Sequence, residues 1–322
     1  MSVIVRETFE KEPHMLRETY CNGLMALAET DPRIVALDAD LMSSSGMKPF
    51  WKKYPDRFIN CGIAEANMVG VAAGLSATGK IPFAHTFGTF ASRRVCDQVF
   101  MSAAYAKLNV RIVGTDPGVT AAFNGGTHMP LEDMAVLRAI PEIILVEPTD
   151  SVQLEAILPQ LISDYGTYYI RLQRKNAAAV YAPGSTFEIG RGDVLRSGKA
   201  VTLIASGILV SEALKAAELL AGQGVDARVI NLFTWKPIDR KLIEVAARET
   251  GAIVTCENHN IVGGLGSAVA EVVGETWPVP IERIGTPDVF GEVGPEDYLR
   301  TRFHLNAVDI AAAATKAVAR KR

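Results

Sequence analysis

Two acids and three hydroxyl side chains follow the apolar run RIVALD, in the segment DADLMSSSG that spans residues 38–46. Carboxylates and hydroxyls at this spacing could bind a metal ion or a hydroxyl-rich ligand. They could equally cap the next helix while the carboxylates stay in solvent. The pattern by itself leaves both interpretations open.

A single acid, Glu65, opens the otherwise apolar, small-residue segment AEANMVGVAAGL. In the first turn of a helix a glutamate is ordinarily a favourable partner of the helix dipole. A carboxyl group removed from water in so apolar a helix could instead share a proton with a ring nitrogen of a ligand. Glu65 is therefore a candidate for proton chemistry as well as a possible helix cap.

The segment FAHTFGTFASRRVCDQV places His85, Phe87, Phe90 and Arg93 between a strand pattern and a helix pattern. Two aromatic residues three positions apart are core residues in most proteins. Here they flank a Gly-Thr turn, where an aromatic face could stack on a planar heterocycle.

A long polar loop, GTDPGVTAAFNGGTHMP, contains Thr115, Asp116, Asn124 and His128. Loops of this length inside a compact domain are often functional. A histidine in such a loop could act as an acid, a base or a hydrogen-bond donor to sugar hydroxyls, or it could be a solvated side chain without a role.

Two arginines, Arg171 and Arg174, come at the end of the strand pattern YYIRLQRKN. Arginine suits bidentate contacts with phosphate or carboxylate, so the pair could bind an anionic substrate. Pairing with acids of the protein itself is the alternative.

The glycines of HNIVGGLGSAVAEVV resemble a dinucleotide-binding motif but do not satisfy it. The third small residue of the motif is replaced by Val269, and the segment CENHNIV separates the glycines from the preceding strand pattern. A nucleotide-binding loop follows its strand directly. Close packing of a helix explains these glycines better.

Apolar β-branched runs alternate with amphipathic segments along the chain, which predicts an α/β protein with mainly parallel sheets and helices on both faces. The segment KNAAAVYAPGSTFEIGRG interrupts this alternation with small residues and glycines, as a linker does. We therefore expect two three-layer α/β domains, residues 1–182 and 190–322.

Composition excludes several classes of protein. The 322 residues carry a formal net charge of −3, which gives no broad positive field for nucleic acid. Charged residues interrupt every apolar run, and the first residues lack the pattern of a signal peptide. The four cysteines show no metal-binding spacing. These observations predict a cytoplasmic protein with free thiols and no membrane or nucleic-acid partner.

Taken in order, the segments resemble the pyrimidine-binding and C-terminal domains of transketolase, a thiamine diphosphate enzyme. The resemblance rests on ALDADLMSSS, FINCGIAEANMVGVAAGL, FAHTFGTF, GGTHMPLEDMAVLRAIP, YIRLQRKN, INLFTWKPID and GGLGSAVAE. The GDG motif of the family's diphosphate-binding domain is missing. The resemblance therefore implies the C-terminal subunit of a split transketolase, active only with a separate N-terminal subunit that carries this motif and the Mg²⁺ ligands, in an α2β2 heterotetramer.

The resemblance also assigns roles to individual residues. Glu65 matches the glutamate that protonates the aminopyrimidine ring, and His128 matches a histidine near the donor's first hydroxyls, so both are expected to be catalytic. The residues expected at the cofactor are Asp40, Glu65, Phe87, Phe90 and Arg93; those expected at the sugar are Arg17, Ser44, Thr115, Asn124, His128 and Arg174. No metal ligand is expected on this chain.

Two departures from the family pattern bear on the substrate. Thr115 stands where a phosphate-binding histidine is usual, and Asn124 stands near a usual aspartate. Transfer of a two-carbon ketol unit is thus better supported than any one donor, which could be a pentose phosphate, a branched sugar phosphate or a sulfosugar. The alternatives are the β subunit of a 2-oxo acid dehydrogenase, an enzyme like 1-deoxyxylulose-5-phosphate synthase, and a non-catalytic scaffold.

Overall fold

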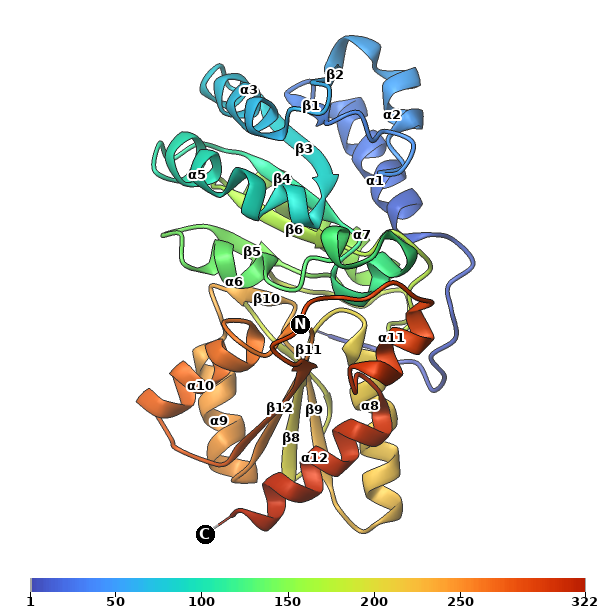
Figure 1. Ribbon diagram of the computed structural model, residues 1–322, viewed down its shortest axis with the longest axis vertical. Coiled ribbons are helices and arrows are strands. Elements are labelled where there is room, and N and C mark those ends of the chain that lie inside the picture. Colours follow the sequence, from blue (N-terminus) through green and yellow to red (C-terminus); the bar gives the residue numbers. More distant parts are fainter. Residues whose placement is uncertain (1, 322) are drawn as a thin grey trace.

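The computed structural model describes residues 2–321, which form two stacked α/β units. In Figure 1 the first unit lies above the second, and helices cover both faces of each sheet. The strands are β1 (Ile34–Asp38), β2 (Phe58–Asn60), β3 (Ile81–Phe87), β4 (Arg111–Thr115), β5 (Ile144–Val146), β6 (Tyr168–Leu172), β7 (Asp193–Arg196), β8 (Val201–Ala205), β9 (Ala227–Asn231), β10 (Thr234–Lys236), β11 (Ile253–Asn260) and β12 (Ile281–Thr286). The helices are α1 (Leu16–Thr30), α2 (Lys48–Lys53), α3 (Glu65–Ala77), α4 (Gly88–Ala91), α5 (Cys96–Gln98), α6 (Asp133–Arg138), α7 (Ser151–Ser163), α8 (Leu209–Gly222), α9 (Arg240–Thr250), α10 (Leu265–Glu275), α11 (Glu296–Arg302) and α12 (Ala307–Ala319).

The first sheet has the order β10-β5-β6-β4-β3-β1-β2, and the strands from β5 to β2 in this order pair in parallel. The second sheet has the order β12-β11-β8-β9-β7. The strands β10 and β7 are antiparallel edge strands of the two sheets. The predicted parallel α/β architecture is confirmed, with one antiparallel edge strand in each sheet that the sequence pattern did not indicate.

Strand β10 belongs in sequence to the second unit but pairs with β5 of the first. Its Trp235 is buried in an apolar core that also contains Leu137 of α6 and Val269 of α10. One core therefore runs across both units. The domain boundary at residues 182–190 stays a prediction, because β10 follows this boundary in the sequence but belongs to the sheet of the first unit.

The segment before α1 lies along the linker as an additional two-stranded pairing. Isolated bridges join Val5 to Tyr181 and Lys11 to Ala178. The Asp150 side chain accepts hydrogen bonds from the backbone N–H groups of Val180 and Tyr181, both at 2.8 Å. The same carboxylate caps α7, so one buried residue fixes both a helix start and the path of the linker.

Candidate active site

Glu65 is the first residue of α3, at the turn that follows β2. The residue is only 3% exposed. Its Oε1 accepts a hydrogen bond from Nη1 of Arg94 at 2.7 Å. The predicted buried carboxyl group at the start of an apolar helix is therefore present, and the sequence had not indicated its arginine partner.

Beside this pair lies an aromatic cluster formed by Phe87, Phe90 and His128. The His128 ring centroid is 5.9 Å from that of Phe87 and 5.2 Å from that of Phe90, both in edge-on geometry. The guanidinium of Arg94 lies 3.8 Å from the centre of the Phe90 ring. Because β3 ends at Phe87 and α4 begins one residue later, the chain turns sharply and presents both phenyl groups on the same side.

The cluster continues through Arg174 to a buried acid. The Arg174 guanidinium lies 5.7 Å from the centre of the Phe87 ring and forms an ion pair of 2.9 Å with Asp116. Asn124 donates a longer hydrogen bond, 3.4 Å, to the same carboxylate oxygen. Burial raises the pKa of Asp116, and the charge of Arg174 opposes this shift.

Arg17 and Ser44 lie next to Arg174. The backbone N–H of Arg17 faces the carbonyl oxygen of Arg174 at 3.4 Å, and its Nη1 donates to the carbonyl oxygen of Ser44 at 2.8 Å. The Ser44 loop is shaped by Asp38, which accepts a hydrogen bond from Ser45 Oγ at 2.8 Å. Burial raises the pKa of Asp38 to about 6. The first acid of this loop therefore organises the loop itself.

Asp40 is exposed and has a positive φ of 63°. It accepts a hydrogen bond from Asn60 Nδ2 at 3.0 Å, at the end of β2. Asn60 in turn accepts from the N–H of Gly62, just before Glu65. Asp40 is thus linked to the turn that carries the buried glutamate.

Two further candidates, Thr115 and Arg93, make their contacts outside the chain of contacts from Glu65 to Ser44. Thr115 is 2% exposed at the end of β4, and its hydroxyl faces the carbonyl oxygen of Thr86 at 3.4 Å. Arg93 forms an ion pair of 2.6 Å with Glu132 rather than with Glu65, and its Nη2 donates to the carbonyl oxygen of Thr127 at 3.4 Å. Their roles in binding substrate and cofactor stay predictions.

Arg171 does not take part in the cluster. Its side chain is fully buried and forms ion pairs with Asp133 at 2.8 Å and Glu147 at 2.6 Å. Burial alone would lower the pKa of this guanidinium, but the two carboxylates hold it above its usual value. Of the two alternatives left open by the sequence, Arg171 follows the second, pairing with acids of the protein.

His85 is likewise structural. It is 1% exposed, and its two ring nitrogens contact the Tyr20 hydroxyl and the Leu37 carbonyl oxygen, each at 2.8 Å. Burial lowers the pKa of His85 to about 4, so the ring is neutral at neutral pH.

Apart from Arg17, which lies in the first turn of α1, every residue of the cluster lies at the end of a strand of the first sheet or in the segment after it. Glu65 comes after β2, the Ser44 loop after β1, Phe87 ends β3, and Arg174 comes after β6. The carboxyl ends of parallel strands meet at one edge of a sheet, where ligands of such folds bind. The structure brings together Glu65, Phe87, Phe90, His128, Arg174, Asn124, Arg17 and Ser44 by direct or successive contacts.

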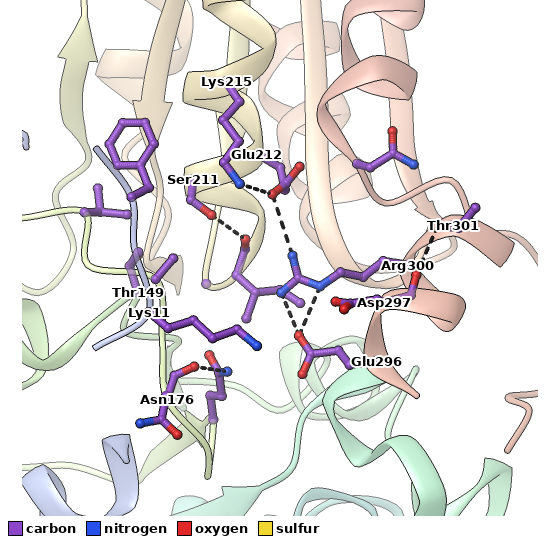
Figure 2. Close-up of a pocket in the computed structure, with 17 residues that line it drawn as sticks. Lys11, Thr149, Asn176, Ser211, Glu212, Lys215, Glu296, Asp297, Arg300 and Thr301 are labelled. Atoms are coloured by element: carbon purple, nitrogen blue, oxygen red, sulfur yellow. Dashed lines mark hydrogen bonds and ion pairs between the residues drawn. The ribbon is translucent and has the colours of Figure 1, made fainter. Parts of the chain in front are cut away.

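A separate cavity of about 330 Å³ opens between the linker, α8 and α11 and contains none of the predicted site residues. Figure 2 shows Arg300 between Glu296 and Glu212, and Lys215 beside Glu212. Most of its charged side chains are therefore already paired with one another.

Comparison with known proteins agrees with this geometry. Residues 12–179 match the model of the transketolase pyrimidine-binding domain, and residues 190–310 match that of the transketolase C-terminal domain. The chain is 53% identical, over 96% of each chain, to the 6-deoxy-6-sulfo-D-fructose transketolase subunit SqwH of Clostridium sp. (strain MSTE9). The chain belongs to the transketolase family.

Two more proteins are similar to this chain over most of its length. A solved structure described as a split gene transketolase, inactive beta4 tetramer, superposes with a TM-score of 0.89 at 45% identity, over 96% of this transketolase chain and 99% of the other. The 1-deoxy-D-xylulose-5-phosphate synthase of Heliobacterium modesticaldum is 36% identical over 93% of this chain but only 46% of its own length. The predicted membership of the transketolase family, with its likeness to a split transketolase subunit, is confirmed.

Proposed function

We propose that this chain and a separate N-terminal subunit with the diphosphate-binding GDG domain form a thiamine diphosphate- and Mg²⁺-dependent transketolase. The proposed assembly is an α2β2 heterotetramer in the cytoplasm, with the Mg²⁺ ligands on the partner. No helix within residues 2–321 has the length and apolar character to cross a membrane. That the structural relative made of β chains is described as inactive supports the need for a second kind of subunit.

The observation that carries the proposal is the contact between Glu65, Arg94 and Phe90. Glu65 and Phe90 both contact the planar guanidinium of Arg94, and a buried carboxylate and a phenyl ring placed in this way suit a planar heterocycle that needs both a proton partner and a stacking surface. The guanidinium of Arg94, also planar and a donor, makes these two contacts in the free chain. The residues present thus fit the aminopyrimidine ring of thiamine diphosphate.

When bound, thiamine diphosphate supplies a nucleophilic thiazolium carbon. We assign Glu65 to hold a proton at a pyrimidine ring nitrogen, and Phe87 and Phe90 to fix the plane of that ring. We assign His128, which is in edge-on contact with both phenyl groups, to donate a hydrogen bond to hydroxyls of a sugar bound above them. Asp40 and Arg93 are assigned to the outer part of the cofactor site.

For the substrate we propose a ketose with an anionic end, such as 6-deoxy-6-sulfofructose. Arg174 and Arg17 are adjacent, and Arg174 lies over the Phe87 ring, so we assign this pair of cations to bind a terminal sulfonate or phosphate. Ser44, Thr115 and Asn124 are assigned to the same pocket. The choice of a sulfonate is supported by the 53% identical relative, which is a 6-deoxy-6-sulfo-D-fructose transketolase subunit.

The test is reconstitution. The chain is purified alone and together with a candidate N-terminal subunit, and ketol transfer is measured with sulfofructose, xylulose 5-phosphate and a neutral ketose. We expect transfer only in the mixture, only with thiamine diphosphate and Mg²⁺, and most efficiently with the sulfonate. Tight Mg²⁺-dependent cofactor binding by this chain alone would contradict the split, and faster transfer from xylulose 5-phosphate would contradict the proposed substrate.

A further inference from the structure

The loop of residues 117–131, between β4 and α6, carries both Asn124 and His128. Its backbone is in an uncommon conformation, because Ala122 has a φ of 48° and Asp116, directly before the loop, has a φ of 58°. Non-glycine residues keep such angles only where the surroundings impose them. Contacts with the surrounding structure are therefore expected to hold the loop in place, in addition to its own backbone hydrogen bonds.

Asn258, at the end of β11 in the second unit, contacts the start of this loop. Its Oδ1 accepts from the N–H of Val119 at 2.9 Å, and its Nδ2 donates to the carbonyl oxygen of Pro117 at 2.8 Å. The side chain is fully buried. A primary amide matches one donor and one acceptor at once, which neither a carboxylate nor an apolar side chain does.

The fit around Asn258 is close. Gly118 lies between the two bonded residues, and a Cβ there would collide with the Asn258 side chain. The backbone carbonyl of Asn258 accepts from Nη2 of Arg171 at 2.9 Å, so the end of β11 is fixed to the first unit. The amide is thus rigidly placed by the buried Arg171 network.

The second unit also contacts the rest of the loop. The N–H of Asn260 donates to the carbonyl oxygen of Leu131 at 2.8 Å, at the loop's far end. In the middle, a Cβ at Gly126 would collide with the carbonyl oxygen of Gly291, from the segment between β12 and α11. The loop is therefore held at its start, centre and end by residues of the second unit.

We propose that Asn258 is a positioning residue for substrate binding: by bridging Pro117 and Val119 it holds the 117–131 loop so that Asn124 and His128 face the sugar. This inference rests on the proposed function, because that function places the two side chains at the substrate. The proposal assigns a role in substrate binding to the CENHN segment, for which the sequence had indicated none. The C-terminal domain then forms part of the substrate site.

Two variants and a matched control test the proposal. Asn258→Ala removes both bonds, whereas Asn258→Asp keeps the size and the acceptor for Val119. Asn260→Ala removes an amide of the same type at the same strand end, where the side chain faces Asp288 and Val262 rather than the loop. Amide hydrogen exchange over residues 117–131 is followed in the full chain without a partner, so this measurement does not depend on activity.

We expect exchange of the loop to become about tenfold faster in Asn258→Ala, less so in Asn258→Asp, and to stay unchanged in Asn260→Ala. In the reconstituted complex, kcat/KM for the anionic ketose should fall by about tenfold in Asn258→Ala, by analogy with the loss of a hydrogen-bonded contact. Exchange at the thiazolium carbon should not change, because Glu65 lies on another element; a general loss of structure would slow that step as well.

Unchanged loop exchange in both Asn258 variants would overturn the inference, whatever the activity. Equal effects of Asn258→Ala and Asn260→Ala would also overturn it. Faster loop exchange with undiminished kcat/KM would show that the loop does not bind substrate, and would remove Asn124 and His128 from the proposed site. Failure of reconstitution with every N-terminal subunit would count against the proposed function. The hydrogen-exchange result would still decide whether Asn258 holds the loop, because it is measured on the chain without a partner.

Discussion

Replacing Arg174 separates anion binding from structural pairing, because the same guanidinium faces both a proposed substrate anion and Asp116. Asp116 is fully buried, whereas the Arg174 side chain is 19% exposed. In Arg174→Ala the carboxylate loses its counter-ion inside the protein. Breaking a fully buried pair costs about 3–5 kcal/mol. Because Arg174 is partly exposed, the expected loss of unfolding free energy is smaller, about 2–3 kcal/mol.

The same substitution should weaken catalysis with anionic sugars. A charge-assisted hydrogen bond contributes about 1.5–3 kcal/mol, which corresponds to a loss of roughly 10- to 150-fold in kcat/KM. A short neutral ketose such as erythrulose does not reach the arginine, so its kcat/KM should change little. Steady-state kinetics of the reconstituted complex with both substrates measures this difference.

The double variant Arg174→Ala with Asp116→Asn provides the control. It removes the stranded charge, so urea unfolding should show stability restored to within about 1 kcal/mol of the parent. Efficiency with the anionic ketose should stay low. If the double variant regained that efficiency, or if the single variant lost equally on charged and neutral sugars, the arginine would serve the fold and the anion-pocket assignment would be refuted.

Three other changes test different parts of the structure. Glu65→Gln should slow hydrogen–deuterium exchange at the thiazolium carbon by roughly a hundredfold in the assembled complex while leaving assembly intact, since an amide cannot share the required proton; an unchanged rate would reduce Glu65 to a helix-capping role. Arg171→Met should lower the free energy of unfolding by about 3–5 kcal/mol, because Asp133 and Glu147 lose their shared cation; denaturant titration would show it, and a loss under 1 kcal/mol would contradict the buried network. Burial raises the pKa of Glu257 to about 8 from its ordinary value of 4.5. Between these two pH values the folded protein keeps a proton that the unfolded chain has released. The stability that the protonated Glu257 contributes is therefore complete below pH 4.5 and is lost as the pH rises through 8. Glu257→Gln should therefore remove about 2–3 kcal/mol of the decline in unfolding free energy between pH 6 and 9, and an equal decline in both proteins would show that another group is responsible.

The mainly parallel α/β architecture of the first unit and most of the cluster could be predicted from local patterns. Apolar runs ending in polar residues mark strand ends, and parallel strands place those ends at one edge, which is why Glu65, Phe87 and Arg174 come together. The two neighbours Arg93 and Arg94 could not be distinguished in this way. Only the turn after α4 decides that Arg94 faces Glu65 and that Arg93 faces Glu132.

Contacts between the two units were beyond the reach of sequence patterns. Asn258 lies in a run of polar residues at the end of the buried strand β11, which is a signal for function but does not say what the amide contacts. Strand β10 has three residues and no periodicity of its own, so its pairing with β5 depends on the packing of Trp235. The separate roles of Arg171 and Arg174 likewise depend on which acids the tertiary structure brings near each strand position.

Because β10 of the second unit completes the sheet of the first, cleavage of the chain between the units should not separate them. A protease cut within residues 183–190 would leave an N-terminal fragment whose sheet lacks its edge strand and a C-terminal fragment with an exposed tryptophan. The shared core around Trp235, Leu137 and Val269 would then act as a non-covalent joint, and the two fragments should remain together on a sizing column until denaturant is added. For fragment complementation or fusion engineering, the linker is a place where the backbone can be opened while the two halves still depend on each other.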